Sequence, residues 1–269
     1  MSVAACAALV EKGDPDRFLA TMAAPVKARA VLFPIYAFNL EVARAPWLTE
    51  EPMIAEMRLQ WWRDALDEIA EKRPVRRHEV ATPLADILDP VGAGLLDSLV
   101  NARRADIEKI PHADDAALDA YLDATAGTLA WAAARALGAD PRAERPLRAH
   151  AWAGGLARYF RAIPELEARG HAPLPDGRPE AVRALAREGL RRYRGGLFLR
   201  EVLGRLKSAS MLDGWLAGVH LTRAARAPIR VAAGQLDVSP ARARITLAIA
   251  ASARRWGAVS GTLDRPPPL

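Results

Sequence analysis

The chain has 269 residues, a formal net charge of +6 and a pI near 9.9, and 51% of its residues are hydrophobic. Cys6 is its one cysteine, which excludes an internal disulfide framework and a cysteine-based metal site. The basic balance permits contact with anionic lipid, an acidic protein surface or a diphosphate, whereas no recognition-helix, zinc or aromatic-basic pattern supports nucleic-acid binding.

The absence of a Gly/Ser-rich linker predicts a single helical domain over residues 1–262, followed by a loose proline-rich tail at 263–269. Much of the apolar content is alanine and strand-like runs are nearly absent, so the expected fold class is all-α. No signal peptide is evident, and the longest uncharged runs reach about half of the roughly 20 residues that a membrane span needs. We expect a cytoplasmic protein, with peripheral attachment to the inner face of the cytoplasmic membrane left open.

Four dipeptides place a capping side chain before a proline, and each predicts a helix start: Asp14-Pro15, Asp89-Pro90, Asp140-Pro141 and Ser239-Pro240. The stretch from Leu32 to Trp47 predicts a buried helix that Pro25 opens or bends and Pro46 closes, with a kink expected at Pro34 unless the helix proper begins there. Its inward stripe carries no acid and consists of Leu32, Tyr36, Leu40, Ala43 and Trp47.

The next predicted helix runs from Thr49 to Ala70, with acids in its first turn and an apolar side marked by Met53, Met57, Trp61 and Leu66. Trp61 and Trp62 are adjacent and must face different directions, so at least one packs at an edge between helices. Further helices are expected at 84–110 (broken), 114–138, 140–169, 180–207 (broken at Gly195-Gly196), 211–226 and 240–256. The helix at 140–169 has an acid-free inward stripe of Trp152, Gly155, Tyr159, Ala162 and Leu166.

Local patterns for catalysis are missing. The five histidines are scattered without metal-ligand spacing, and neither a phosphate loop nor a nucleophile elbow occurs. Two acid pairs, Asp64 with Glu68 and Asp119 with Asp123, are one helical turn apart, but such pairs are common on solvated faces. The sequence therefore assigns no catalytic residue and no metal ligand.

Several segments, in the right order along most of the chain, resemble the squalene/phytoene synthase family. They are DRFLATMAAPVKARAVLFPIYAF, the L-x-W-W-R-D-A-L block at Leu59 to Leu66, the helix at 121–138 and the RGHAPLP turn. The resemblance implies a helical isoprenoid synthase bundle. Active members of the family carry two D-x-x-x-D motifs that hold magnesium against the substrate diphosphate.

In this chain the positions of the four motif aspartates are degenerate: they are Ala43, Trp47, Ala162 and Leu166. Glu165 and Glu167 are expected on another face, in a helix that Pro164 disturbs. The run AFN-x-E and the run R-A-x-P instead resemble a non-catalytic branch of the family that acts in the assembly of respiratory complex I.

The resemblance implies an inactive assembly or chaperone factor without a cofactor, whose partners are protein subunits of a membrane respiratory complex. One alternative is a farnesyl or geranylgeranyl diphosphate transferase, which would need Mg²⁺, and a second is a protein that binds an apolar isoprenoid lipid. An anionic membrane surface is a further candidate partner. The side chains expected to line the cavity or contact a partner are Tyr36, Asn39, Leu40, Arg44, Trp61, Trp62, Arg63, Arg158, Tyr159 and Arg161.

Overall fold

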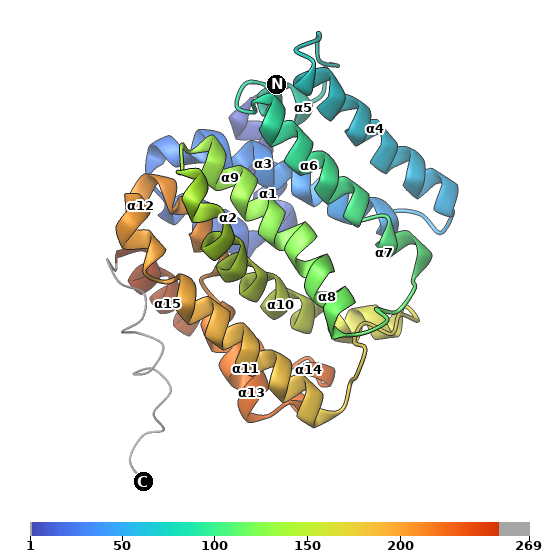
Figure 1. Ribbon diagram of the computed structural model, residues 1–269, viewed down its shortest axis with the longest axis vertical. Coiled ribbons are helices and arrows are strands. Elements are labelled where there is room, and N and C mark those ends of the chain that lie inside the picture. Colours follow the sequence, from blue (N-terminus) through green and yellow to red (C-terminus); the bar gives the residue numbers. More distant parts are fainter. Residues whose placement is uncertain (1, 253–269) are drawn as a thin grey trace.

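The computed structural model describes residues 2–252, and every regular element within them is helical (Figure 1), which confirms the all-α class. The first half contains α1 (Val3–Gly13), α2 (Pro15–Ala23), α3 (Val26–Arg44), η1 (Ala45–Trp47), α4 (Pro52–Ala70), α5 (Ala81–Ala85), α6 (Pro90–Ala102), α7 (Ala105–Glu108), α8 (Asp115–Leu122) and η2 (Asp123–Gly127). The second half contains α9 (Thr128–Ala136), η3 (Pro141–Ala143), α10 (Glu144–Ala168), α11 (Pro179–Gly196), α12 (Leu199–Lys207), η4 (Ala209–Gly214), α13 (Ala217–Arg226), α14 (Ile229–Ala232) and α15 (Pro240–Ser252).

All four capping dipeptides start helical segments as predicted. The Asp14 carboxylate accepts a hydrogen bond from the Arg17 backbone N–H, Asp89 accepts one from Gly92, and Asp140 accepts one from Arg142. The three distances lie between 2.7 and 3.1 Å. The Ser239 hydroxyl accepts from the Arg242 N–H at 3.4 Å. These side chains satisfy donors that the first helical turn cannot pair internally, so local sequence fixes where these helices begin.

Two prolines interrupt less than the sequence predicts. The helix around the first stripe already begins at Val26 and continues through Pro34, and α10 continues through Pro164. A proline removes one backbone hydrogen bond, and Pro34 lies among buried neighbours that hold the helix in place, whereas Pro164 is partly exposed and next to the buried Ile163. Pro46 does end the α-helix, because Ala45–Trp47 forms a 3₁₀ turn.

The prediction that Met53 and Met57 belong to the buried apolar side of α4 is wrong. The helix begins at Pro52, after the acids, and both Met53 and Met57 are exposed. Side chains toward its C-terminal end pack on the core instead, on the other side of the helix axis from the methionines, namely Leu59, Trp62, Leu66 and Ile69. The predicted break in the basic helix falls just after Gly196, between α11 and α12, and the predicted tail lies outside the described residues.

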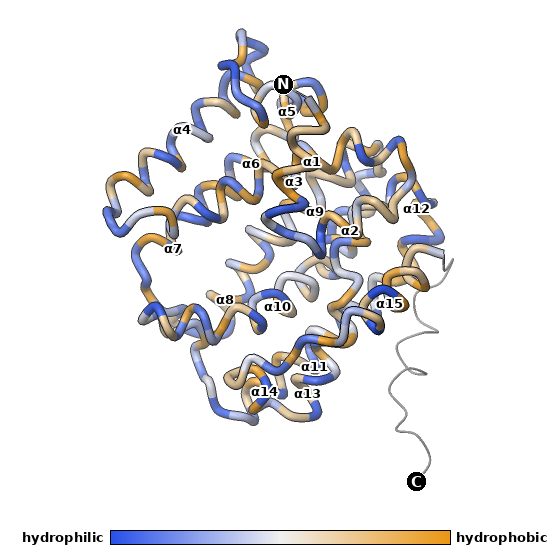
Figure 2. Tube along the Cα trace, turned by 180° about the vertical axis from the view of Figure 1, so that it is seen from behind, coloured by the Kyte–Doolittle hydropathy of each residue, from blue (hydrophilic) through white to orange (hydrophobic). Residues whose placement is uncertain are grey.

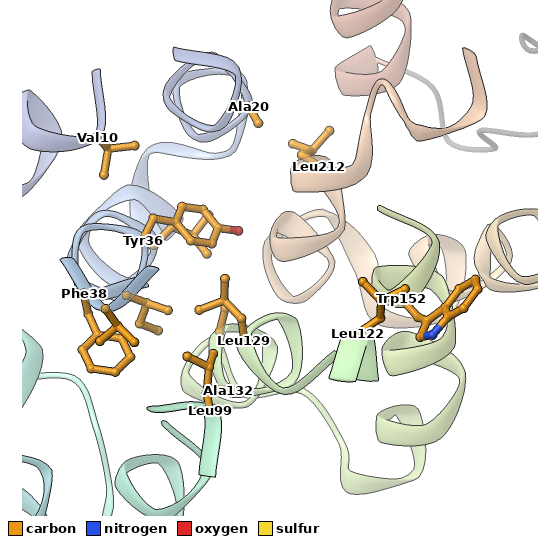
Figure 3. Packing of buried hydrophobic residues seen from close by; sticks show 14 of the residues in the cluster. Val10, Ala20, Tyr36, Phe38, Leu99, Leu122, Leu129, Ala132, Trp152 and Leu212 are labelled. Atoms are coloured by element: carbon orange, nitrogen blue, oxygen red, sulfur yellow. The ribbon is translucent and has the colours of Figure 1, made fainter. Parts of the chain in front are cut away.

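The core gathers side chains from α3, α6, α9 and α10. In Figure 3, Tyr36 comes from α3, Leu99 from α6 and Leu129 from α9, and all belong to one buried cluster. Along most helices apolar and polar residues alternate (Figure 2), as expected for helices with one buried side. None of the helices within residues 2–252 is long and apolar enough to cross a membrane.

α10 passes unusually close to its neighbours at the predicted glycine pair. A Cβ atom on Gly155 would lie 2.5 Å from Cβ of Ala126, in the π-helical turn η2, and one on Gly154 would lie 3.4 Å from Cα of Gly214. Only glycine leaves room at position 155, whereas the distance at position 154 is an ordinary van der Waals contact. The prediction of a close helix approach is therefore confirmed at Gly155.

Candidate functional site

Two adjoining cavities lie between α3, α8 and α10, at the place where both inward stripes meet. Their volumes are about 330 Å³ and 240 Å³. Five residues line both of them: Ala43, Arg103, Tyr121, Tyr159 and Ala162. We call the larger one the outer cavity and the smaller one the inner cavity.

All four degenerate motif positions line the outer cavity. Ala43 and Trp47 come from the end of α3 and from η1, and Ala162 and Leu166 come from α10. Ala162 is exposed, so solvent reaches this wall. Two segments far apart in sequence thus present the motif positions to one space, as the family resemblance implies.

The Trp47 ring is held between a histidine and an arginine at the mouth of the outer cavity. Its centroid lies 4.9 Å from that of His171, and the Arg169 guanidinium lies 5.3 Å from the indole centroid. Arg169 also pairs with Glu165 at 2.7 Å. An aromatic ring in tilted contact with His171 therefore stands where the resemblance implies a metal-binding carboxylate.

The inner cavity ends on a buried ion-pair network. Arg17 donates to Asp14 at 2.9 Å and to Asp213 at 2.9 Å, and Arg158 donates to Asp213 at 2.8 Å. Burial alone would raise the pKa of Asp213, but Arg158 and Arg17 outweigh it and hold that pKa below its usual range. The Arg17 guanidinium also lies 5.0 Å from the Tyr36 ring centroid.

A second network forms the wall between the cavities. The Arg103 guanidinium donates to Asp106 at 3.1 Å and to the Tyr121 hydroxyl at 2.7 Å, while that hydroxyl donates to the other Asp106 oxygen at 2.7 Å. Desolvation raises the pKa of Tyr121 far above its ordinary value, so the phenol stays protonated. Beside it the Tyr159 hydroxyl donates to the Pro173 carbonyl at 2.8 Å.

The donor set does not fit a magnesium clamp. The carboxylates that line the cavities are Asp14, Asp106 and Glu165, and an arginine pairs with each one. Within residues 2–252 no three His, Cys, Asp or Glu side chains are grouped so that they could hold a metal ion. Glu165 does line the outer cavity, so the expectation that it lies on another face is wrong.

The structure brings some of the candidate side chains to the cavities. Asn39, Leu40, Arg158 and Tyr159 line the inner cavity, and Tyr36 is buried beneath Arg17 without lining either space. The lining of the two cavities is less apolar than the stripes predict, because four arginines contribute to it.

The remaining candidates lie elsewhere. Arg44 is exposed, and Arg161 pairs with Asp16 at 2.8 Å and with Asp237 at 2.6 Å. Trp61 and Trp62 line a separate groove on α4, and Arg63 pairs with Asp97 at 2.6 Å. The two acid pairs are outside the cavities: Glu68 pairs with Arg76, Asp119 with Arg192 and Asp123 with Arg148, while Asp64 accepts from Gln60.

Sequence reasoning missed the polar interior of the site. Arg17 stands inside the DRF run that supports the family resemblance, so that motif contained a signal for it. Arg103, Asp106 and Asp213 stand in segments with no motif. Arg103 and Asp106 are three positions apart, but Tyr121 on α8 joins them only through packing, and Asp213 in η4 meets Arg17 on α2 and Arg158 on α10 only in the fold. Their role could not be read from spacing.

The fold is that of a helical isoprenoid synthase. A crystal structure of a dehydrosqualene synthase superposes on 91% of this chain and 94% of that chain with a TM-score of 0.70, at 15% sequence identity. The family model described as squalene/phytoene synthase matches residues 10–257. The chain therefore belongs to the squalene/phytoene synthase family.

Similar curated proteins carry the name of a respiratory assembly factor. The complex I assembly factor 6 homolog of Drosophila melanogaster is 32% identical over 179 residues, covering 62% of this chain and 52% of that protein. Complex I assembly factor 6 of Bos taurus and that of Homo sapiens are each 24% identical over 183 residues, covering 63% of this chain and 52% of each relative. The chain thus spans about half the length of these relatives, and the resemblance read from the short motifs is confirmed.

Proposed function

We propose that this protein is a non-catalytic member of the squalene/phytoene synthase family that assists the assembly of respiratory complex I. The observation that carries the proposal is the identity of four residues around one cavity, where Ala43, Trp47, Ala162 and Leu166 replace the metal-binding aspartates. That the process is complex I assembly is inferred from the names of the similar proteins in fly, cow and human.

The chemistry of the site supports the loss of catalysis. Ionisation of an allylic diphosphate develops negative charge on the leaving group, which metal ions held by carboxylates stabilise. Here Asp14 and Asp106 neutralise Arg17 and Arg103 instead, and Asp213 neutralises Arg158. On the described cavity walls, neither a metal clamp nor a cluster of unpaired cations is left to stabilise a departing diphosphate.

Deletion of the gene tests the proposal. We expect lower amounts of assembled complex I and lower NADH:quinone reductase activity, with succinate dehydrogenase activity unchanged as the control. A plasmid copy of the wild-type gene should restore complex I, and the empty plasmid serves as the control. Unchanged complex I in the deletion strain would contradict the proposed function.

A cytoplasmic position at the inner face of the membrane belongs to the same proposal. The chain is basic overall, and α12 with its preceding turn exposes Phe198 and Val202 one helical turn apart beside Arg194 and Arg205. Apolar side chains next to arginines suit an anionic lipid surface. Sedimentation with phosphatidylglycerol vesicles should carry the protein down at low salt, and recovery in the supernatant under those conditions would contradict membrane attachment.

Binding of an apolar isoprenoid lipid is a second candidate function, favoured by the two adjoining cavities. Together they offer space on the scale of ligand pockets, with Leu40, Leu122 and Leu129 among the apolar lining of the inner one. Native mass spectrometry of the purified protein should then reveal a bound lipid that Ala162→Trp displaces. A spectrum with the apo mass alone would contradict the carrier function.

A further inference from the structure

Asn39 is a buried polar side chain on the wall of the inner cavity. It is 6% exposed and belongs to α3. Its amide carries one acceptor oxygen and two donor N–H bonds, yet no residue within 2–252 forms a hydrogen bond with it, and neither amide atom is fully enclosed by protein. Burial of an amide without a partner costs stability, so packing alone does not explain an asparagine at this position.

The other uncharged polar side chains on this wall are already paired. The Thr125 hydroxyl donates to the Tyr121 carbonyl at 2.7 Å. The Tyr121 hydroxyl bonds to Asp106 and the Tyr159 hydroxyl to the Pro173 carbonyl, as described above. Among the uncharged polar side chains described on the inner cavity, only Asn39 has no partner. Much of the remaining lining is apolar, and Figure 3 labels two of its leucines, Leu122 and Leu129.

The charges around the inner cavity cancel. Three guanidinium groups line it, and a carboxylate holds each one: Arg17 pairs with Asp14 and Asp213, Arg158 with Asp213, and Arg103 with Asp106. Among the described lining residues an anionic head group would find no unpaired guanidinium. Transfer of an unpaired charge into such a space is costly, whereas an uncharged polar group needs only a hydrogen bond. The lining therefore favours a neutral ligand.

The two cavities follow one another along α3 and α10. Asn39 lines the inner cavity alone, Ala43 lines both, and Trp47 lines the outer one alone. On α10, Ala162 likewise lines both cavities and Leu166 the outer one alone. Four residues of α-helix rise about 6 Å, so Asn39 lies about one helical turn inward of the shared wall. A chain-like ligand with its head at Asn39 would extend outward past Ala43 and Ala162.

We propose that the inner cavity binds a lipid with one uncharged oxygen head group, an alcohol or a carbonyl, and that Asn39 recognises this head. A carbonyl oxygen accepts from the amide N–H, and a hydroxyl pairs with either the N–H or the oxygen of the amide. The hydrocarbon chain occupies the apolar lining and the outer cavity. The proposal rests on the second candidate function, because it names the head group of the isoprenoid lipid that the cavities would carry.

Four ligands with the farnesyl skeleton test the head group separately from the chain: farnesol, farnesal, the hydrocarbon farnesene and farnesyl diphosphate. Each competes with tritiated farnesol for the full-length protein in equilibrium gel filtration without magnesium. We expect farnesol or farnesal to displace the label at about tenfold lower concentration than farnesene, because only an oxygen head gains the hydrogen bond. Farnesyl diphosphate should compete about tenfold more weakly than farnesol or less, because its charge stays unpaired in the cavity.

Asn39→Leu locates the head group. The variant should bind tritiated farnesol about tenfold more weakly and bind farnesene no more weakly than the wild type. Its melting temperature without ligand should be no lower than that of the wild type, because leucine replaces an unpartnered amide, and this separates lost recognition from lost folding. Asn101→Leu is the matched control, since Asn101 is exposed on α6 outside both cavities, and it should leave binding unchanged.

Three results would overturn the inference: farnesene that competes as well as farnesol and farnesal, farnesyl diphosphate that competes better than both, or farnesol binding that Asn39→Leu leaves intact. Equal binding of farnesene would remove the head-group recognition and leave the lipid carrier function standing. Absence of binding by all four ligands would overturn the inference and the carrier function together. The assembly function is decided separately by complex I in the deletion strain.

Discussion

The Arg17 Nε atom lies 2.9 Å from Oδ1 of Asp213, although 196 positions separate the two residues in the sequence. The pair ties α2 to η4, and both side chains are more than nine-tenths buried. Arg158 joins the same carboxylate from α10. The buried Asp213 carboxylate therefore holds together α2, α10 and η4, three segments that no family motif links.

Asp213→Asn should be strongly destabilising, because it removes the carboxylate partner of Arg158 and leaves the buried Arg17 with Asp14 as its remaining counter-ion. Breaking one side of a buried ion pair costs about 3–5 kcal/mol in the free energy of unfolding. Asp176→Asn is the matched control, since the Asp176–Arg178 pair is exposed and such pairs contribute little. Urea titrations of the three proteins measure the difference, and equal midpoints for the wild type and Asp213→Asn would contradict the role of the network.

His150 should make stability depend on pH. Burial lowers the pKa of its imidazole from 6.5 to about 4, so the folded protein holds the ring neutral where the unfolded chain binds a proton. The free energy of unfolding should therefore fall as pH drops from 6.5 toward 4, by about 1.4 kcal/mol per pH unit from this group. In His150→Gln the slope of the unfolding free energy against pH should be smaller by the contribution of one proton. Urea titrations over this pH range measure it.

The same variant at about pH 8 gives the reference, because there His150 is neutral in both states. His220 has its pKa lowered to about 3 by burial and, less strongly, by nearby arginines, so part of the slope should remain in His150→Gln. An unchanged slope would show that His150 is protonated in the folded protein or accessible to water.

Helix starts and the inward stripes could be predicted because they depend on local chemistry. A capping carboxylate before proline acts within one turn, and the stripe from Leu40 to Trp47 follows from helical periodicity. The two buried networks could not be predicted, since Arg103 meets Tyr121, and Arg17 meets Asp213, only after distant helices pack. The error at Met57 has a related cause: apolar character predicts burial, whereas here it lines an open groove.

Gly155→Ala should destabilise the contact between α10 and the π-helical turn η2. The added Cβ would meet Cβ of Ala126 at 2.5 Å, so backbone must shift, and overpacking of this kind typically costs about 1–3 kcal/mol. Gly94→Ala is the control. That glycine lies exposed in α6 with no heavy atom within 4 Å of an added Cβ, so alanine should stabilise by about 0.5–1 kcal/mol through helix propensity. Melting temperatures that move the same way in both variants would contradict the close approach.

Returning aspartates to positions 43 and 47 should not create a magnesium site. The change Ala43→Asp with Trp47→Asp removes the ring that contacts His171 and Arg169, a loss of about 0.5–1.5 kcal/mol per aromatic contact. Positions 162 and 166 would still lack carboxylates, and Arg169 and Arg103 would compete for the new ones. Thermal melts with and without MgCl₂ should coincide, and a melting temperature that rises with magnesium would show that two aspartates suffice.

Incubation with farnesyl or geranylgeranyl diphosphate and Mg²⁺ should release no diphosphate above a protein-free blank, as measured by a pyrophosphatase-coupled phosphate assay. Each carboxylate on the cavity walls already neutralises an arginine, so ionisation of the substrate would leave its negative charge without the metal ions that stabilise it. Asp64→Ala and Asp119→Ala should be equally silent, because neither side chain lines the cavities and Asp119 pairs with Arg192 on α11. A dehydrosqualene synthase assayed in parallel gives the positive control. Magnesium-dependent release that Asp106→Asn abolishes would show that the Arg103–Asp106 pair opens to admit a metal, and the protein would then be a prenyl diphosphate transferase with a relocated carboxylate set.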